Sequence, residues 1–491
     1  MKENEMDNKI VNAAKWSSIT EIAAKLIGPL TNMILARLIA PEAFGVVATV
    51  TMIISFADMF TDAGFQKYLI QHEFKDDREK YRYANVAFLT NLIIAIFLWG
   101  IIILFSEQIA VLVGNKGLGD VVAIACIQLP LTAFSSIQMA LYRRNFDFKT
   151  LFWVRIFSLC VPIFVIIPLA FLGLSYWSLI IGSIIMQISN AIILTIKSSW
   201  KPNLFYDMRI LKDMLSFSVW SLVEAISIWL TTWIDAFIIG SLLSEHLLGI
   251  YKTSTTMVNA LMAIVTASIV PVLFSALSRL QNNSEQFNMM YFKMQKIVSI
   301  FIFPLGVGVY LYSDLATQIL LGSKWGEASE VIGIWALTST IMIVYGHFCS
   351  EVYRAKGRPK LSFLAQLLHL VVLIPVCIVS AKYGFWALVY ARSWIRLELV
   401  LVHLIFMKFI IGISVSKTFS NTLPAAIAAI IMGSLGFFLQ KLGEGITWSF
   451  ISIVICMIAY FLLLSFFPTV REEMKILLRR LVPSRLKELI K

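Results

Sequence analysis

Charged and amide side chains interrupt segments of this chain that are otherwise strongly apolar. An ionisable residue at the middle of a bilayer costs about 2.5–3.5 kcal/mol on insertion scales, so such residues face protein or water and mark sites for polar ligands or ions. The cationic and amide candidates for ligand contact are Lys25, Asn32, Arg155, Lys252, Asn259, Arg392 and Arg396. The acidic candidates, for charge pairing or for carrying a coupling proton or sodium ion, are Glu21, Asp58, Asp62, Glu224 and Asp235.

Two arginines in the second half of the chain are the strongest indication of a ligand. Arg392 and Arg396 are four residues apart, so a helix places both on one face, whereas the nearby acid Glu398 falls on another face. Adjacent cations in a cavity are typical of a site for a phosphate or carboxylate group, because guanidinium groups bind both of these groups in bidentate fashion. We therefore expect an anionic ligand here.

Structural roles are the alternative for several of the other candidates. Glu21 and Lys25 are spaced to form a buried ion pair with each other. Asp58 and Asp62 are placed to cap the outer end of their helix. Arg155 lies close enough to the start of its helix for its long side chain to reach the inner head groups.

The composition excludes a water-soluble globular protein. Of the 491 residues 59% are hydrophobic and only 14% are charged, whereas soluble domains have about 25% charged residues. The pattern predicts an all-α integral membrane protein with about fourteen transmembrane helices. The predicted spans are 13–37, 42–64, 83–106, 118–142, 150–172, 175–197, 213–240, 247–275, 293–318, 329–353, 359–381, 384–409, 419–440 and 446–467.

The basic residues between these spans predict the orientation of the chain. They gather in the connections near residues 67–82, 143–149, 197–212, 279–296 and 354–360, which are alternate connections. Because short cytoplasmic loops are rich in Lys and Arg, both termini are predicted to be cytoplasmic. The net charge of +12 therefore indicates membrane topology and no nucleic-acid partner. The basic tail 469–491 is predicted to lie on the inner leaflet, or alternatively to be a solvated end.

An internal repeat predicts the division of the chain. Trp16-Ser17 matches Trp220-Ser221 at an offset of 204 residues, and Gly45 matches Gly249 at the same offset. Each copy would hold six spans, so the copies would be two pseudo-symmetric lobes around a central cavity, related by an axis along the membrane normal. We predict an N-lobe at 1–205, a C-lobe at 206–412, two further helices at 413–468 and the tail at 469–491.

Motifs for catalysis and cofactors are missing from the sequence. It has no Gly-rich phosphate loop followed by Lys-Ser/Thr. The five cysteines lie within apolar runs, none at metal-ligand spacing, and are interpreted as small core residues. No outer loop is long enough to house an active site. We expect a protein that is not an enzyme, with no catalytic residues, no metal and no cofactor beyond H⁺ or Na⁺ coupling.

Several runs of the sequence resemble a known family. Ala14–Ile19, Leu35–Gly45, Phe60–Phe65, Gln138–Lys149 and Tyr176–Leu179 are similar to polysaccharide exporters of the Wzx/TuaB type. These belong to the multidrug/oligosaccharidyl-lipid/polysaccharide (MOP) flippase superfamily. The resemblance implies a multi-pass flippase of the cytoplasmic (inner) membrane that works by alternating access. It would move a polyprenyl-pyrophosphate-linked oligosaccharide, the repeat unit of a cell-surface polysaccharide such as lipopolysaccharide.

The resemblance also implies binding partners, and three alternative functions have to be weighed against the flippase. The partners would be an anionic lipid-linked oligosaccharide, membrane lipids and the polysaccharide polymerase or export machinery. The sequence leaves the oligomeric state open, and a monomer is compatible with it. The first rival is a cation-coupled exporter of small drugs from the same superfamily, against which the basic intramembrane residues argue. A membrane glycosyltransferase or polymerase would need acidic residues on a sizeable outer loop. A structural scaffold would have no use for buried charges.

Overall fold

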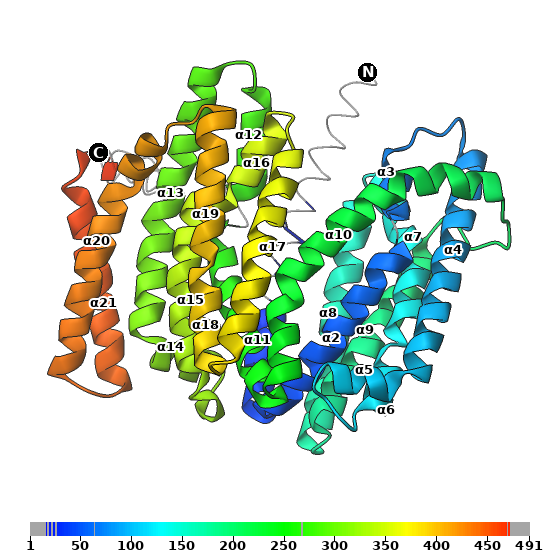
Figure 1. The fold of residues 1–491 in the computed structure, drawn as a ribbon, viewed down its shortest axis with the longest axis horizontal. Coiled ribbons are helices and arrows are strands. Elements are labelled where there is room, and N and C mark those ends of the chain that lie inside the picture. The colour runs from blue at the N-terminus through cyan, green and yellow to red at the C-terminus, as the bar shows by residue number, and fades with distance from the viewer. Residues whose placement is uncertain are drawn as a thin grey trace, which may run out of the picture. The chain divides into compact units, whose positions relative to one another are not determined.

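The protein is described by a computed structural model that covers residues 16, 19–20, 23–24, 27–62, 64–266, 269–468 and 470–471, and all regular structure within them is helical (Figure 1). The helices, in chain order, are α2 (Pro41–Asp62), α3 (Phe65–Gln71), α4 (Asp77–Leu104), α5 (Ser106–Leu112), α6 (Gly119–Ala125), α7 (Gln128–Arg144), α8 (Phe148–Phe171), α9 (Ser175–Lys197), α10 (Met208–Leu242), α11 (Glu245–Thr266), α12 (Ile269–Arg279), α13 (Ser284–Leu311), α14 (Ser313–Leu320), α15 (Ala328–Met342), α16 (Cys349–Ala355), α17 (Lys360–Ala381), α18 (Phe385–Trp394), α19 (Arg396–Phe406), α20 (Val415–Leu442) and α21 (Ile446–Ser465), with the 3-10 helix η1 (Ser323–Trp325) and the π-helices η2 (Ile343–His347) and η3 (Met407–Ile411).

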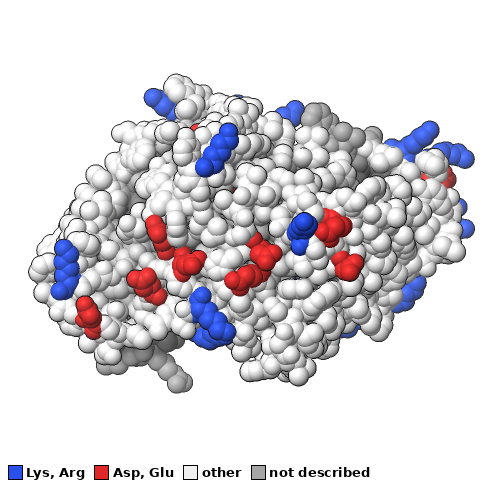
Figure 2. Space-filling view, turned by 60° about the horizontal axis from the view of Figure 1, so that its bottom comes forward, with Lys and Arg blue, Asp and Glu red and all other residues white. Residues whose placement is uncertain are grey.

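Eleven helical segments of the described residues are long and apolar enough to cross a membrane. The protein is therefore a multi-pass membrane protein. Large apolar side chains point outward, such as Phe164 of α8, which is 79% exposed, and Figure 2 shows wide areas of surface without a charged side chain. The predicted spans 13–37, 247–275 and 384–409 are not among the eleven, so the count of fourteen crossings stays a prediction.

Three long helices begin earlier than the apolar runs predict, which corrects the predicted boundaries. α4, α10 and α13 begin at residues 77, 208 and 284, whereas their spans were predicted from 83, 213 and 293. In each case the preceding residue caps the helix. The side chains of Asp76, Asp207 and Asn283 accept hydrogen bonds from backbone N–H groups of the first turn. The extensions are polar and amphipathic, so hydropathy alone does not reveal them.

Several of the predicted continuous spans are interrupted, and two of them show how. The span 118–142 is divided into α6 and α7 at Cys126–Ile127. Pro130 explains the break, because it has no N–H to donate to the carbonyl of Cys126 and its ring clashes there. The span 384–409 is divided into α18 and α19 at Ile395 and then continues into the π-helix η3.

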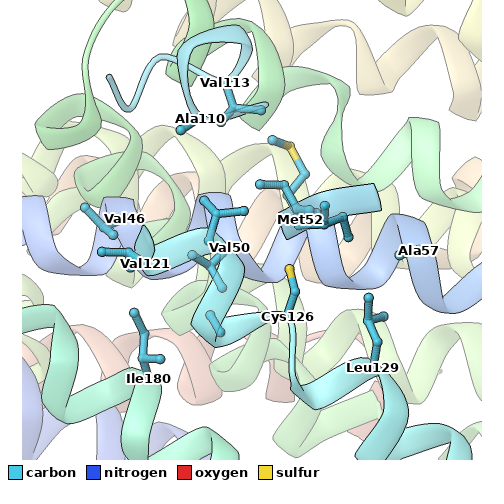
Figure 3. Packing of buried hydrophobic residues seen from close by; sticks show 14 of the residues in the cluster. Val46, Val50, Met52, Ala57, Ala110, Val113, Val121, Cys126, Leu129 and Ile180 are labelled. Carbon is cyan, nitrogen blue, oxygen red and sulfur yellow. The ribbon is translucent and has the colours of Figure 1, made fainter. Parts of the chain in front are cut away.

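The helices form two compact units. Unit 1 comprises Met1–Thr256, Leu321–Trp325 and Leu370–Arg392, and unit 2 comprises Met257–Leu320, Gly326–His369 and Ser393–Lys491. Unit 1 has a core in which α2 packs against α6, α7 and α9; Figure 3 shows Val46, Val50, Met52, Val121 and Ile180 in this core. In unit 2, α13 packs along α15 and α20, and α20 packs along α21. The units follow packing and do not test the predicted lobe boundaries, which stay predictions.

Within unit 1, α2 and α11 cross at two glycines. A Cβ atom on Gly45 would lie 1.9 Å from the main-chain oxygen of Glu245, and one on Gly249 would lie 1.9 Å from that of Pro41. Only glycine permits this approach. The contact is reciprocal, because 41 and 245, like 45 and 249, differ by the repeat offset of 204. Glu42 Oε1 also lies 2.8 Å from Nδ1 of its repeat equivalent, His246. This symmetric contact supports the predicted repeat.

Candidate functional site

The structure describes the side chains of most predicted site residues. Glu21, Lys25 and residues 472–491 of the predicted basic tail lie outside the described residues. For Asp62 and Glu224 only the helical backbone is described, in α2 and α10. Asn32 is half-buried within the helical residues 27–38, which precede α2 in the chain. The remaining candidates fall into four places.

The first place is a buried ion pair in unit 1. Arg392, near the end of α18, directs its Nε to Oδ2 of Asp235 in α10 at 2.7 Å, and its Nη2 lies 3.4 Å from the carbonyl oxygen of Thr231. Arg392 is 7% exposed and Asp235 is 3% exposed. Asp235 was predicted as an acid that pairs or couples, and the structure shows it paired with Arg392.

Two residues of α11 complete this group, which we call the Asp235 network: Asp235, Tyr251, Lys252 and Arg392. The hydroxyl of Tyr251 donates to Asp235 Oδ2 at 2.8 Å. Lys252 Nζ donates to the carbonyl of Thr232 at 3.1 Å and lies 3.8 Å from the centre of the Trp233 ring. The carboxylate is thus held by groups from α10, α11 and α18. Isolated burial of any of these charges would be costly, and their mutual contacts offset that cost.

The second place, in unit 2, joins the predicted residues Asn259 and Arg396 through an aromatic ring. Arg396 Nη1 donates to Ser339 Oγ at 2.8 Å, and its guanidinium lies 4.3 Å from the centre of the Trp335 ring. The Trp335 indole N–H donates to Asn259 Oδ1 at 3.1 Å. Glu398 is paired with another residue, His369, at 2.8 Å. The structure therefore gives Arg392 and Arg396 separate surroundings, and their joint role in ligand binding stays a prediction.

The third place is a polar cavity in unit 1, which we call the Arg155 cavity. It has a volume of about 580 Å³ and lies between α7, α8 and α9. Thr20 and Ala24, which precede α2 in the chain, are also on its wall. Arg155 and Arg143 line it, and both are exposed. Its other polar wall residues are Thr132, Ser135, Gln187 and Asn190. Among the described wall residues none is acidic.

Hydrogen bonds between α7 and α9 hold the polar wall of this cavity. Gln187 Nε2 donates to Thr132 Oγ1 at 3.1 Å, and Asn190 Nδ2 donates to Gln187 Oε1 at 3.2 Å. Gln138 Nε2 donates to Thr195 Oγ1 at 3.1 Å outside the cavity. The wall is therefore ordered before any ligand arrives.

Asp58 lies in a second polar pocket of unit 1, the fourth place. This pocket has a volume of about 380 Å³ and shares Thr132 with the Arg155 cavity. Its wall has an acid, Asp58, and a base, Lys67, together with Gln66 and Asn91. Polar side chains thus continue from one pocket to the next inside apolar helices. The sequence predicts one central hydrated cavity between the two lobes, and that cavity stays a prediction.

In contrast to the two polar pockets of unit 1, unit 2 has an apolar groove. It has a volume of about 390 Å³ and lies between α13, α14, α20 and α21. Its wall is formed almost entirely by aliphatic and aromatic side chains, such as Leu305, Ile319 and Phe461. Tyr312 and Tyr460 also line it, but their hydroxyls donate to Ser452 and to the carbonyl of Ile300. The groove therefore suits a hydrocarbon chain.

Six polar residues of the Arg155 cavity were missed by sequence reasoning: Thr20, Thr132, Ser135, Arg143, Gln187 and Asn190. A signal was present for two of them. Ser183, Gln187 and Asn190 recur at i, i+4 and i+7, which places them on one face of α9. Sequence reasoning treats Arg143 only as a loop charge, because it lies one residue beyond the predicted span 118–142, whereas α7 continues to Arg144.

The sequence is similar to a known protein family and to several of its characterised relatives. Residues 34–330 match the family described as "Polysaccharide biosynthesis protein". The lipopolysaccharide biosynthesis protein WzxC of Escherichia coli (strain K12) is 20% identical over 380 residues, which cover 76% of this chain and 75% of that protein. The teichuronic acid biosynthesis protein TuaB of Bacillus subtilis (strain 168) is 22% identical over 357 residues, covering 72% and 73%.

The fold is similar to that of solved structures as well. The lipid II flippase MurJ, in an inward closed conformation, superimposes with a TM-score of 0.76 at 18% identity, covering 92% of this chain and 98% of MurJ. An inward-facing multidrug resistance transporter of the MATE family superimposes with a TM-score of 0.56 at 12% identity, covering 87% and 100%. These likenesses show the fold.

Proposed function

This chain belongs to the polysaccharide biosynthesis protein family, as a multi-pass member of the MOP flippase superfamily, and from that premise we propose its cargo and mechanism. The cargo is a polyprenyl-pyrophosphate-linked oligosaccharide, the repeat unit of a cell-surface polysaccharide. The protein moves it across the cytoplasmic membrane by alternating access, without a chemical step. Relatives named for the biosynthesis of lipopolysaccharide and teichuronic acid support this assignment.

The observation that carries the proposal is the polar interior of unit 1. Arginines and amides within an apolar membrane helix are costly unless they face protein, water or a polar ligand. Arg143 and Arg155 face a cavity of about 580 Å³, and a neighbouring pocket of about 380 Å³ continues its polar wall. This interior has space, positive charge and hydrogen-bonding groups for an anionic sugar-bearing head. Lys25, Asn32, Lys252, Asn259, Arg392 and Arg396 remain further proposed contacts.

The apolar groove of unit 2 is the second observation behind the proposal, because it suits the polyprenyl chain of the cargo. A polyprenyl chain is a hydrocarbon and needs an apolar surface or the bilayer itself. The groove between α13, α14, α20 and α21 supplies such a surface. We assign the two C-terminal helices, outside the six-helix repeats, to this contact with the lipid tail.

Alternating access requires two parts that can rock about one another. The proposed parts are the lobes 1–205 and 206–412, with fourteen crossings in total and both termini in the cytoplasm. The reciprocal contact of Gly45 and Gly249 supports them, because repeat-equivalent residues meet as they would near a pseudo-two-fold axis. Separation of α2 from α11 at these glycines would open that side of the protein.

Energy coupling is proposed to use H⁺ or Na⁺ without any other cofactor. Asp235 is already neutralised by Arg392 and accepts from Tyr251. Asp58 borders a polar pocket and is the better-placed acid for a coupling ion. The protein is proposed to act as a monomer that delivers its cargo to the polymerase or export machinery.

A deletion strain tests the proposed function. We expect loss of the surface polysaccharide and accumulation of the lipid-linked repeat unit, both restored by the wild-type gene. Purified protein in liposomes should then move a labelled lipid-linked oligosaccharide between leaflets. Drug sensitivity of the deletion strain with normal surface polysaccharide would instead support the small-molecule exporter.

A further inference from the structure

A pair of ionisable side chains in unit 2 takes no part in the function proposed above. His369 of α17 places its Nδ1 2.8 Å from Oε2 of Glu398 in α19. We infer that these two residues form a proton-binding site that holds one exchangeable proton inside the apolar part of the protein. Proton binding stands on the geometry of the pair, whereas the use of this proton to drive transport rests on the proposed function.

The pair lies deep within the membrane-spanning part of unit 2. His369 is nine residues after Lys360, the first residue of the apolar helix α17, which corresponds to about 13.5 Å along a helix. That is close to half of a hydrocarbon core of about 30 Å. His369 is only 1% exposed. Ionisable residues at this depth are costly and by default mark functional sites, so we expect of this pair a role beyond packing.

The chemistry of the base distinguishes this pair from the Asp235 network. A guanidinium is not deprotonated in proteins, so Arg392 is a permanent cation beside Asp235. An imidazole in ordinary surroundings changes its charge between about pH 5 and 8. His369 can therefore face Glu398 either as an imidazolium or as a neutral ring, and these two states of the pair differ by one proton.

The carboxylate gives this proton a route of exchange. The Glu398 side chain is 24% exposed, whereas those of His369 and Asp235 are 2% and 5% exposed. A carboxylate at this depth faces protein or water rather than lipid, because its burial in hydrocarbon is too costly. The open part of Glu398 is therefore in contact with water. A purely structural ion pair needs no such access, but an exchangeable proton does.

A second histidine limits the number of protons at this place. His403 of α19 is buried, and its Nδ1 lies 3.1 Å from the hydroxyl of Tyr353 in α16. It is close enough to His369 for two imidazolium rings to repel each other, which favours a single proton. The other ionisable side chains of α17, of α19 and of the elements packed against α19 are Lys360 and Cys377 in α17, Arg396 in α19, Lys408 in η3, Tyr345 and His347 in η2, and Glu330 in α15.

Proton occupancy has a mechanical consequence for unit 2. With the proton bound, the imidazolium of His369 and the carboxylate of Glu398 join α17 to α19 as an ion pair. Without it, the carboxylate loses its charged partner at this contact and the two helices are held together less strongly. The proton therefore biases the contact between α17 and α19, and a biased contact between helices is what a proton-coupled transporter requires.

The first test measures proton binding directly. The full-length protein is reconstituted in phosphatidylcholine bilayers with ¹⁵N-labelled histidine, and solid-state NMR follows each ring with pH. The chain has five histidines, so single substitutions assign their signals. We expect His369 to change its charge between about pH 5 and 8. Glu398→Gln should weaken the binding of this proton about ten-fold or more, because the carboxylate favours the imidazolium.

His72→Gln is the matched control for this titration. His72 belongs to unit 1, and its ring stacks on that of Tyr68 with the ring centres 4.7 Å apart. This change should leave the titration of His369 as it is in the wild type. A His369 ring that keeps one charge over the whole pH range would overturn the site. So would a titration of His369 that Glu398→Gln leaves unchanged.

The second test separates proton exchange from packing. His369→Arg keeps a cation beside Glu398, but a guanidinium releases no proton. In liposomes with wild-type protein, a gradient of one pH unit should change the distribution of a labelled lipid-linked oligosaccharide between the leaflets about ten-fold, as one proton per turnover permits. His369→Arg should remove this response, and His369→Gln, which has no charge, serves if the arginine variant does not fold. A gradient response that His369→Arg keeps and Asp58→Asn loses would assign coupling to the Asp58 pocket and overturn the coupling role of the pair.

Failure of this site and failure of the proposed function give different results. If the wild-type protein moves no lipid-linked oligosaccharide, the proposed function falls, and a titration of His369 that depends on Glu398 would still support the proton site. If wild-type transport follows the pH gradient while His369 does not titrate, the proton site falls and the proposed function stands.

Discussion

The Asp235 network and the Arg155 cavity both place arginines within apolar helices of unit 1, and they use them differently. Arg392 is 7% exposed, and its Nε lies 2.7 Å from Asp235 Oδ2. Arg143 and Arg155 line a cavity of about 580 Å³ whose described wall residues include no acid. In the first region the charge is balanced inside the protein. In the second region the arginine side chains line a cavity, where they can donate hydrogen bonds to a ligand.

The two kinds of arginine are expected to contribute to different properties, the paired one to stability and the cavity-lining ones to ligand binding. A buried guanidinium that is paired with a carboxylate contributes mainly to holding α10, α11 and α18 together, and loss of one partner leaves the other uncompensated. An arginine at a cavity wall contributes little to folding, because its bonds are made to water or to a ligand. Changes in the Asp235 network should therefore mainly lower the free energy of unfolding. Changes in the Arg155 cavity should mainly lower polysaccharide export.

The largest effect on stability is expected from Arg392→Ala. Among the described residues, it leaves the buried Asp235 carboxylate with the Tyr251 hydroxyl and a backbone N–H as donors. The free energy of unfolding should fall by about 3–5 kcal/mol. Thermal unfolding of the purified protein checks this. The matched control changes both partners, Asp235→Leu with Arg392→Met, and should recover most of the loss. An Arg392→Ala protein as stable as wild type would remove the distinction between the two regions.

Much of the fold could be predicted from the sequence, because transmembrane helices depend on composition over about twenty residues. Helices occupy the predicted spans from Pro41 onward. The starts of α4, α10 and α13 were missed, since their first turns are polar and are fixed by Asp76, Asp207 and Asn283. The π-helices η2 and η3 have no local signal and depend on packing.

The candidate site could be predicted only in part. Sequence spacing identified Asp235, Arg392 and Arg155 as unusual, because each interrupts an apolar helix. It could not tell which of them would be paired, since Asp235 and Arg392 are 157 residues apart and meet only through tertiary packing. Arg143 was read as a loop charge because its role depends on the neighbouring helices α8 and α9.

A smaller effect on stability is expected from Tyr251→Phe. The change removes the hydroxyl that donates to Asp235 Oδ2 at 2.8 Å but keeps the Arg392 contact. Hydrogen bonds to charged groups are worth about 1.5–3 kcal/mol, and the free energy of unfolding should fall by that amount. The control is Tyr383→Phe, because Tyr383 is 80% exposed. Equal unfolding temperatures of the two variants would show that the network does not depend on this hydroxyl.

Gln187→Leu should have a still smaller effect on stability and a clear effect on export. It breaks the bond to Thr132 and removes the acceptor of Asn190, and interhelical hydrogen bonds in membranes average about 0.6 kcal/mol. Gln138→Leu is a matched control, since Gln138 also joins α7 to α9 but does not line the cavity. The two variants should unfold alike, whereas only Gln187→Leu should reduce surface polysaccharide. Equal export would place the cavity outside the transport route.

The smallest effect on stability is expected from Arg155→Gln, at less than about 0.5 kcal/mol, because the side chain is exposed and forms no described ion pair. Surface polysaccharide in the deletion strain should nevertheless fall, since the cavity loses one of its two arginines. Arg155→Lys keeps the charge without the bidentate geometry and should restore export in part. A variant that unfolds early would mean that Arg155, like Arg392, is a structural charge, and the contrast between the two regions would then disappear.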